Sequence, residues 1–509
     1  MFEPALPEFA PTYEAGTAQL VSTRLIADLE TPVSAFLKLS QGRNGNLFLL
    51  ESVEGGAARG RYSMIGLDPD LLWRASGDRA EINRTPTANP EDFVDCGQKP
   101  LTALRGIIAE SAIDVPIAAT HALPPMAAGI FGYLGYDMVR QMEELAPAKP
   151  DPIGVPDAIL MRPTIMVVFD TVKDEIWVVT PVRPANGTSA AQAYSNALER
   201  LDKIVGVLEG PLQHDIAAAD PHLLAAQGVS NTPESEFLGM VAKAKEHIVA
   251  GDIFQVVLSQ RFTAPFALPA FALYRALRRV NPAPFLCYLD FGGFQIVCSS
   301  PEILVRVREG KVTIRPIAGT RWRGKTPAED NALAAELLAD PKERAEHLML
   351  LDLGRNDVGR VAEIGTVNVT DKFFVERYSH VMHIVSNVEG QLDPAHDTID
   401  ALAAGFPAGT VSGAPKVRAM QIIDHLERDK RGIYGGCIGY FGASGEMNTC
   451  IVLRTSIVKD GFMHVQAGAG IVFDSEPASE HRECVNKAMA LFRAAEEAVR
   501  FATRAKRGQ

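Results

Sequence analysis

The residues with the clearest chemical potential are two pairs of glutamates, Glu343 with Glu346 and Glu480 with Glu483. Each pair has i,i+3 spacing, which places both carboxylates on one face of a helix. Carboxylates from two helices suit a hard cation such as Mg²⁺, which favours oxygen ligands and leaves positions open for an anionic substrate. The alternative is a solvated surface, because Glu343 could complete a capping box and Glu483 could pair with Lys487.

The sequence around both pairs predicts helices. Asp340 can cap a helix whose first residue is Pro341, just before the first pair. After the second pair, apolar residues recur at helical spacing, so Glu480, Glu483 and Lys487 share a different face of that helix. The apolar residues are Val485, Ala488, Met489, Phe492 and Val499.

The composition is that of a globular chain with two domains or one large one. Of its 509 residues, 47% are hydrophobic and 22% charged, which excludes disordered and fibrous classes. A net charge of −12 argues against nucleic acid or an anionic membrane as the main partner. No signal peptide or membrane-length apolar run is present, so we expect a cytoplasmic protein. The six cysteines stand singly, without metal-ligand spacing, and we expect reduced, mostly buried thiols.

The arrangement of strand signals predicts an α+β fold, with large antiparallel sheets. Most of the first two hundred residues contain short strands separated by turns. The polar, alanine-rich stretch 210–231 is typical of a linker. We therefore expect an amino-terminal part at 1–231 and a second part at 232–509. In the second part, the strand at 253–262 would place Gln255 and every second residue after it on one face.

Other residues that could bind or react with a substrate stand in apolar or glycine-rich segments. Gly468 and Gly470 in AGAGIVFDS would let backbone N–H groups approach an anion, and GFPAGTVSGAPK adds Thr410. Arg454 stands in an apolar strand segment, where a buried guanidinium needs a partner such as a carboxylate. Glu302 and His383 are candidates for an acid and a base. Each also has an ordinary explanation, as a turn, a structural salt bridge or a structural polar contact.

Together these motifs resemble those of the chorismate-utilising enzymes, over about residues 232–499. The resemblance lies in FQVVLSQRF, SSPE, RPIAGTRWRG, EHLMLLDLGRND, VMHIVSNVEG, FPAGTVSGAPK, RGIYGG, CIVLRT and AGAGIVFDSEPASEHRE. The whole chain is similar to the large components of anthranilate synthases within that family. The resemblance implies the chorismate-utilising fold, with helices outside the sheets, and the first step of tryptophan biosynthesis.

The same resemblance implies roles for individual residues. Mg²⁺ would be held by Glu346 and Glu483 directly and by Glu343 and Glu480 partly through water, and it would hold the ring carboxylate of chorismate. Glu302 would protonate the departing C4 hydroxyl. Substrate contacts would come from Tyr434, Arg454, Gly468, Ala469, Gly470 and Lys487, with Thr410 beside the catalytic groups.

Two uncharged residues bear on the nucleophile. Family members that add water carry a lysine at the position of Gln255, and glutamine cannot serve as that base. Aminodeoxychorismate synthases commonly carry a nucleophilic lysine where this chain has Ala318. The resemblance therefore favours direct attack by ammonia at C2, followed by loss of the C2 proton and of pyruvate to give anthranilate. We infer that His383 acts in that second step.

The resemblance also implies feedback inhibition by L-tryptophan. The segment LLES resembles the family's tryptophan motif and supplies Leu50, Glu51 and Ser52. It works with a second segment, here NPAPFLC, which supplies Pro284, Phe285 and Leu286 in place of the usual NPSPYMF. The altered residues keep an apolar surface but change its shape and remove a hydroxyl.

Nothing in the sequence resembles a glutaminase, so we expect ammonia from a separate glutaminase subunit in a hetero-oligomer. Two alternatives stay open. One is an aminodeoxychorismate synthase component I without the lysine, or a homologue that stops at aminodeoxyisochorismate. The other is a catalytically silent tryptophan-binding regulator on the same fold.

Overall fold

The computed structural model describes residues 2–52, 60–114, 123–212, 228–378 and 381–504. The helices are α1 (Leu6–Glu14), α2 (Pro32–Ser40), α3 (Pro100–Ser111), α5 (Ala190–Glu209), α6 (Glu234–Val249), α7 (Ala270–Val280), α8 (Pro327–Ala339), α9 (Pro341–Gly359), α10 (Thr398–Gly405), α11 (Lys416–Leu426) and α12 (Pro477–Arg504). Two short 3₁₀ helices are η1 (Tyr136–Gln141) and η3 (Gly409–Val411). None of the helices in these ranges is both long and apolar enough to cross a membrane.

The strands up to β11 are β1 (Gln19–Ile26), β2 (Leu47–Ser52), β3 (Tyr62–Ser76), β4 (Arg79–Asn83), β5 (Val94–Asp95), β6 (Gly129–Leu134), β7 (Ala158–Asp170), β8 (Glu175–Val182), β9 (Val229–Ser230), β10 (Gln255–Pro265) and β11 (Phe285–Asp290). The remaining strands are β12 (Gln295–Ser300), β13 (Ile303–Arg308), β14 (Lys311–Ile314), β15 (Ile317–Trp322), β16 (Asn368–Arg377), β17 (Val381–Gln391), β18 (Gly413–Ala414), β19 (Cys437–Gly442), β20 (Met447–Ile451), β21 (Thr455–Lys459) and β22 (Phe462–Ile471).

The strands form one continuous antiparallel arrangement. One path of neighbours runs β10, β22, β21, β12, β11, β2, β3, β7. From β7 it continues through β6, β19, β20, β13, β14 and β17. Because antiparallel sheets can bury one face and carry helices there, this order agrees with the predicted α+β class.

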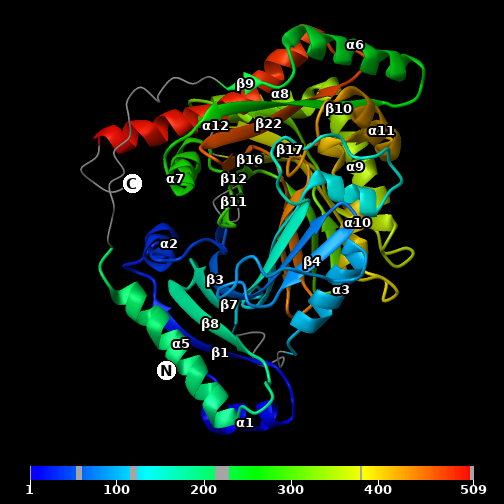
Figure 1. The fold of residues 1–509 in the computed structure, drawn as a ribbon. Helices are drawn as coiled ribbons and strands as arrows, with labels where there is room; N and C mark the ends of the chain where they lie inside the picture. Colours follow the sequence, from blue (N-terminus) through cyan, green and yellow to red (C-terminus); the bar gives the residue numbers. More distant parts are fainter. Residues whose placement is uncertain (1, 53–59, 115–122, 213–227, 379–380, 505–509) are drawn as a thin grey trace.

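Helices cover the sheet at its two ends. Figure 1 shows α5 lying along β8 and β1 at one end, and α12 crossing near β22 at the other. The apolar faces of both helices belong to one core cluster, to which α7 also contributes. The predicted apolar stripe of α12 is confirmed, since Ala488, Phe492 and Val499 are buried in this core.

Most predicted strands are present, but the amino-terminal part also contains helices, although we predicted mainly strands and turns there. These are α1, α2, α3 and α5. For α5 the signal exists, because Ser189 caps the helix and buried residues recur from Ala193 through Leu208 at helical spacing. Much of the predicted linker at 210–231 lies outside the described residues. Strand β2 pairs with β11, and β6 pairs with β19, so both pairings join the two sides of residue 231. The domain boundary at residue 231 stays a prediction.

A buried ion pair fixes the strand that carries Gln255. Arg431 donates to both carboxylate oxygens of Glu427 at 2.6 and 2.9 Å, and to the carbonyl oxygens of Val257 and Val411 at 2.7 and 2.5 Å. Glu427 also accepts bonds at Oε1 from the N–H and the hydroxyl of Ser259, at 2.8 and 2.9 Å. The pair therefore joins β10, η3 and the end of α11. We call it the Glu427–Arg431 pair.

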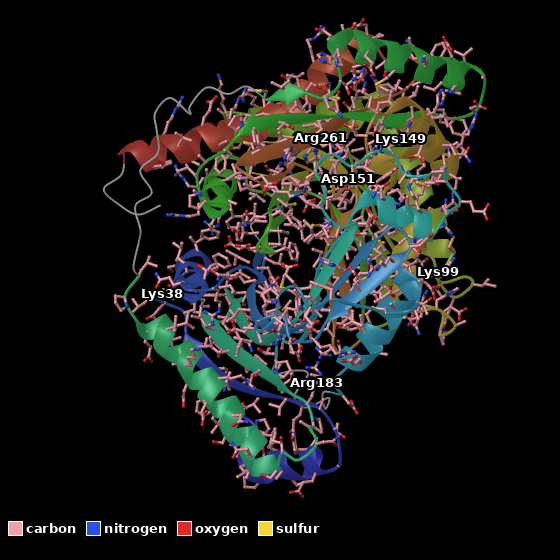
Figure 2. All side chains as sticks on the ribbon, viewed as in Figure 1. Lys38, Lys99, Lys149, Asp151, Arg183 and Arg261 are labelled. Carbon is pink, nitrogen blue, oxygen red and sulfur yellow. The ribbon has the colours of Figure 1, made fainter. Side chains whose placement is uncertain are left out.

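The same strand is bound again further along. Arg261, labelled in Figure 2, lies on β10 and donates to Asp429 at 2.8 Å. Since Glu427, Asp429 and Arg431 belong to one short segment, that segment sets the position of β10 along much of its length.

We expect Arg431→Met to lower the free energy of unfolding by about 3–5 kcal/mol, because it leaves the Glu427 carboxylate buried without its cation. Urea unfolding followed by circular dichroism measures the change. The control is Asp352→Asn, which removes an exposed pair with Arg355 and should change stability by less than about 0.5 kcal/mol. Equal effects of the two substitutions would contradict the role given to the Glu427–Arg431 pair.

Candidate active site

A cavity of about 700 Å³ lies between β10, β22, β15, β17 and the helices α9 and α12. It gathers nearly all the residues that the sequence predicted for catalysis, substrate binding and metal binding. Those on its wall are Gln255, Glu302, Glu343, Glu346, His383, Thr410, Tyr434, Arg454, Gly468, Gly470, Glu480, Glu483 and Lys487. Ala318 lines it as well.

The floor of the cavity is formed by the paired strands β10 and β22, and β22 contributes Gly468 and Gly470 to it. Gly470 lies opposite Val257 in the ladder between β22 and β10. A Cβ atom at Gly470 would lie 2.5 Å from Nε2 of Gln255, and one at Gly468 would lie 2.9 Å from the hydroxyl of Tyr434. Gly468 is therefore required by close packing rather than by a turn, since a Cβ atom there would also lie 2.9 Å from the carbonyl oxygen of Leu258. At Gly470 a larger residue would displace the end of the Gln255 side chain.

Ala469 does not lie on the cavity wall. Successive side chains of a strand point to opposite faces, and that of Ala469 is fully buried in a core with residues of α6 and α11. The side chain of Ala469 therefore points away from the cavity, and the substrate contact that the resemblance implies for this residue stays a prediction.

Gln255 presents a buried hydrogen-bond acceptor without a partner. Its side chain is 5% exposed and lines the cavity. Among the described residues, none donates to its Oε1 atom. An unpaired buried acceptor costs free energy, so this oxygen is ready to accept a bond from a donor that enters the cavity.

Glu302 is a carboxylic acid held in a desolvated position. It follows β12 and is 5% exposed. Burial raises its pKa to about 8, although the Thr410 hydroxyl donates to its Oε1 at 3.1 Å and so opposes the shift. The group therefore carries a proton at neutral pH and can donate it, as a general acid must.

His383 is held as a neutral imidazole. Its Nδ1 atom lies 2.8 Å from the carbonyl oxygen of Gly319 and 3.2 Å from the hydroxyl of Thr320. Because a carbonyl can only accept, Nδ1 carries the proton and Nε2 is left as the basic nitrogen. Burial lowers the pKa of His383 to about 4, so the ring is uncharged at neutral pH.

Arg454 stands where an apolar run is interrupted. The predicted strand over 447–461 is divided into β20 and β21, and Arg454 lies between them with a φ of 48°. A left-handed conformation is costly for a non-glycine residue and often marks a functional site. The expected carboxylate partner is absent: within the described ranges, no acidic group forms an ion pair with this guanidinium. Burial lowers its pKa, and the cation faces the cavity.

The glutamate pairs lie on α9 and α12, as predicted. Burial, followed by neighbouring carboxylates, raises the pKa of Glu346; burial and Glu483 likewise raise that of Glu480. Lys487 donates to Glu483 at 2.7 Å and to the carbonyl of Gly468 at 2.9 Å. Hence only part of this negative charge is balanced by cations.

Glu343 does not complete the capping box that was the alternative. Asp340 caps α9 by accepting from the N–H of Glu343 at 3.3 Å, but its own N–H donates to Glu336. The Glu343 carboxylate accepts instead from Arg321 at 3.1 Å. Glu343 therefore belongs to the charged wall of the cavity.

These four carboxylates fit a hard divalent cation by donor type and by charge. They offer oxygen donors, and after burial the neighbouring carboxylates raise the pKa of Glu346 and of Glu480. An added cation would relieve that repulsion. No three of their oxygen atoms lie within 4.8 Å of one another. Among the described residues, only three cysteines bring their metal-binding atoms that close together. A cation held there would keep room for water and a substrate oxygen.

Sequence reasoning missed several cavity residues. Thr320 and Trp322 alternate with Ala318 along β15, so the alternation of the quoted RPIAGTRWRG motif was a usable signal. Lys342 and Gln466 also line the cavity. They stand next to predicted residues, but no pattern in the sequence distinguishes them.

A second, smaller cavity of about 170 Å³ lies under β2 and β11. We call it the β2–β11 cavity. Leu50, Glu51, Ser52 and Phe285 line it, as predicted for the tryptophan motif. Leu286 instead faces the opposite core and is fully buried, and Pro284 is not on the wall.

The carboxylate of Glu51 is already bound by helix α7. Tyr274 donates to it at 2.5 Å, and Arg278 donates at 2.8 and 3.1 Å. Glu51 therefore joins β2 to α7, in addition to contributing to the wall of the β2–β11 cavity.

Comparison with known proteins agrees with this geometry. The chorismate binding enzyme family matches residues 69–493. Anthranilate synthase component 1 of Cereibacter sphaeroides is 55% identical over 98% of this chain and 99% of its own length. The crystal structure of anthranilate synthase component I from Streptococcus pneumoniae covers 92% of this chain and 99% of its own, with a TM-score of 0.73 and 35% identity.

A more distant structure supports the fold alone. The menaquinone-specific isochorismate synthase from Escherichia coli has a TM-score of 0.68 at 18% identity, and covers 97% of this chain and 99% of its own. Since the family match spans most of the chain and the identities are high, the chain belongs to the chorismate-binding enzymes, and within them to the anthranilate synthase component 1 group.

Proposed function

We propose that this chain is the aminating subunit of an anthranilate synthase, which converts chorismate and ammonia to anthranilate and pyruvate. The observation that carries the proposal is the composition of the large cavity. It combines a protonated Glu302, a neutral His383, an Arg454 without an acidic partner among the described residues and four carboxylates, but has no lysine at residues 255 or 318. The names of the similar proteins point the same way.

The substrate's carboxylates are bound by cations and by the glycine floor. Arg454 has no acidic partner among the described residues, and it faces the cavity. Lys487 stands near Gly468 on the neighbouring wall. The glutamates of α9 and α12 would hold Mg²⁺, which when bound supplies positive charge for the ring carboxylate and lowers the charge that opposes substrate entry.

The first step is amination at C2 of the ring. Ammonia forms a bond to C2, the ring double bonds shift, and the C4 hydroxyl leaves as water with the proton of Glu302. The ammonium group formed at C2 then releases one proton, which balances the proton that Glu302 gave up. The unpaired Oε1 of Gln255 accepts an N–H of ammonia and so orients its lone pair. The product of this step is aminodeoxyisochorismate.

The second step makes the ring aromatic. Removal of the C2 proton drives cleavage of the C3–O bond, and the enolpyruvyl group leaves as pyruvate after it gains a proton. His383 suits the base, because its Nδ1 proton is held by Gly319 and Nε2 is free to accept.

Two further features are proposed on the same basis. Ammonia comes from a separate glutaminase subunit, which agrees with the designation of the relatives as component 1, and the two chains form a hetero-oligomer. L-tryptophan inhibits by binding in the β2–β11 cavity, whose wall combines apolar Leu50, Met64 and Phe285 with the polar Ser52 and Asn448.

Product analysis tests the proposed function. With chorismate, Mg²⁺ and an ammonium salt, we expect the purified chain to release anthranilate and pyruvate in equal amounts, identified by mass spectrometry. Formation of 4-amino-4-deoxychorismate would support the aminodeoxychorismate synthase alternative. No turnover, with tryptophan binding retained, would support the silent regulator.

We expect Glu302→Gln to lower kcat by about 10²- to 10⁴-fold, because the amide cannot donate the proton. In the unchanged chain, activity falls as the pH rises through the Glu302 pKa of about 8, since only the protonated form is an acid. The residual activity of the Glu302→Gln variant should not show this fall at basic pH. Glu309→Gln, at an exposed residue, is the control. If the activity of the Glu302→Gln variant still falls as the pH rises through this range, another group causes the fall.

We expect Ser52→Phe to raise the tryptophan concentration needed for half inhibition by about tenfold or more, because the larger side chain occupies the β2–β11 cavity. Inhibition curves with ammonium as the nitrogen source measure this effect, and thermal melting shows whether the variant is folded. Val172→Phe, at an exposed residue, is the control. Unchanged inhibition in a folded Ser52→Phe variant would place tryptophan elsewhere.

A further inference from the structure

Three cysteine side chains that are distant in the sequence meet inside the sheet. Cys287 lies on β11, Cys298 on the adjacent β12, and Cys450 on β20. Their sulfur atoms all lie within 4.8 Å of one another, and the side chains are only 4%, 0% and 2% exposed. We call them the cysteine triad. The triad could not be predicted from the sequence, because no two of these residues have metal-ligand spacing.

The separation of the sulfur atoms is close to what a thiophilic cation requires. With a Zn–S bond of about 2.3 Å, three thiolates around one ion lie about 4 Å apart. Sheet pairing holds two of the three, since Cys287 and Cys298 are direct partners in the ladder between β11 and β12. Movements of less than about 1 Å would therefore complete a three-sulfur site.

The triad is open on one side. Cys287 and Cys450 form part of the wall of the β2–β11 cavity, whereas Cys298 lies behind them. This opening gives a path for an ion and space for a fourth ligand, which zinc sites normally have. Asn448 lines the same cavity, and its buried Oδ1 accepts no bond from any described residue. It stands two residues before Cys450 on β20, on the same face of the strand.

The surroundings can balance the charge of a metal–thiolate group. Binding of a divalent cation by three thiols releases three protons and leaves one net negative charge. Arg61, Arg306 and Arg308 line the same cavity. Arg61 is paired with Asp170, and Arg308 lies 3.9 Å from Glu309. Arg306 forms no ion pair with a described residue, so it is the cation available to balance this charge.

The Cys298 thiol donates to the carbonyl oxygen of Leu453 at 3.8 Å, and the Thr455 hydroxyl donates to the same carbonyl at 2.9 Å. Once the thiol has lost its proton, this hydroxyl could turn to donate to the thiolate.

We propose that the cysteine triad binds a thiophilic d¹⁰ cation of the Zn²⁺ class, with its open position toward the β2–β11 cavity. This site is separate from the carboxylate site, which suits hard cations and contains no sulfur. It does not depend on the proposed reaction. The ordinary alternative is that three small buried side chains only fill the core.

Cadmium binding tests the proposal, because thiolate-to-Cd²⁺ charge transfer absorbs in the ultraviolet and carboxylates give no such band. The full chain, reduced with a non-thiol reductant, is titrated with Cd²⁺ in excess Mg²⁺. We expect the band to saturate at one equivalent and to be displaced by Zn²⁺. Cys298→Ala, which leaves the two cysteines that line the cavity in place, should abolish saturation at one equivalent.

Cys437→Ala is the matched control, since Cys437 is equally buried on the neighbouring β19. It should bind Cd²⁺ as the unchanged chain does, and circular dichroism shows that both variants are folded. The absence of a thiolate band in the unchanged chain would overturn the proposal. So would an equal band in Cys298→Ala and Cys437→Ala.

Discussion

A charged side chain that is buried in this sheet must be balanced by an opposite charge or by hydrogen bonds. This constraint governs both the stability of the fold and the chemistry of the cavity. The Glu427–Arg431 pair meets the constraint internally, because each group is bound by the other and by the backbone of β10 or η3. The two elements so fixed carry Gln255 and Thr410. On the other wall of the cavity the glutamates of α9 and α12 are only partly balanced, by Arg321 and Lys487. We propose that a cation and an anionic substrate complete the balance at that wall.

The same principle explains the individual groups. Glu302 keeps its proton because burial makes its ionised form unfavourable, and His383 stays neutral for the same reason. Arg454 cannot lose its charge in this way, since a guanidinium is protonated at any ordinary pH. It remains a cation without an acidic partner among the described residues, in a strained backbone conformation. Acid, neutral base and unpaired cation thus arise from one low-dielectric cavity.

Local patterns in the sequence predicted much of this site. Spacing of i,i+3 placed Glu343 with Glu346 and Glu480 with Glu483 on helix faces, and strand alternation placed Gln255 toward the cavity. Alternation also explains why the side chains of Ala469 and Leu286 point away from the two cavities, to the opposite faces of their strands. What local patterns could not supply is long-range register. The binding of Glu51 by Arg278 and the meeting of Cys298 with Cys450 depend on strands and helices far apart in the chain.

Direct measurement of Mg²⁺ binding tests the central claim, that the charge on α9 and α12 is left for a cation to balance. Isothermal titration of Mg²⁺ into the chain should give one bound ion. Binding should be lost in Glu346→Gln but kept in Glu309→Gln, which changes an exposed glutamate outside the cavity wall. Equal binding by the two variants, or none by the unchanged chain with chorismate present, would contradict the account.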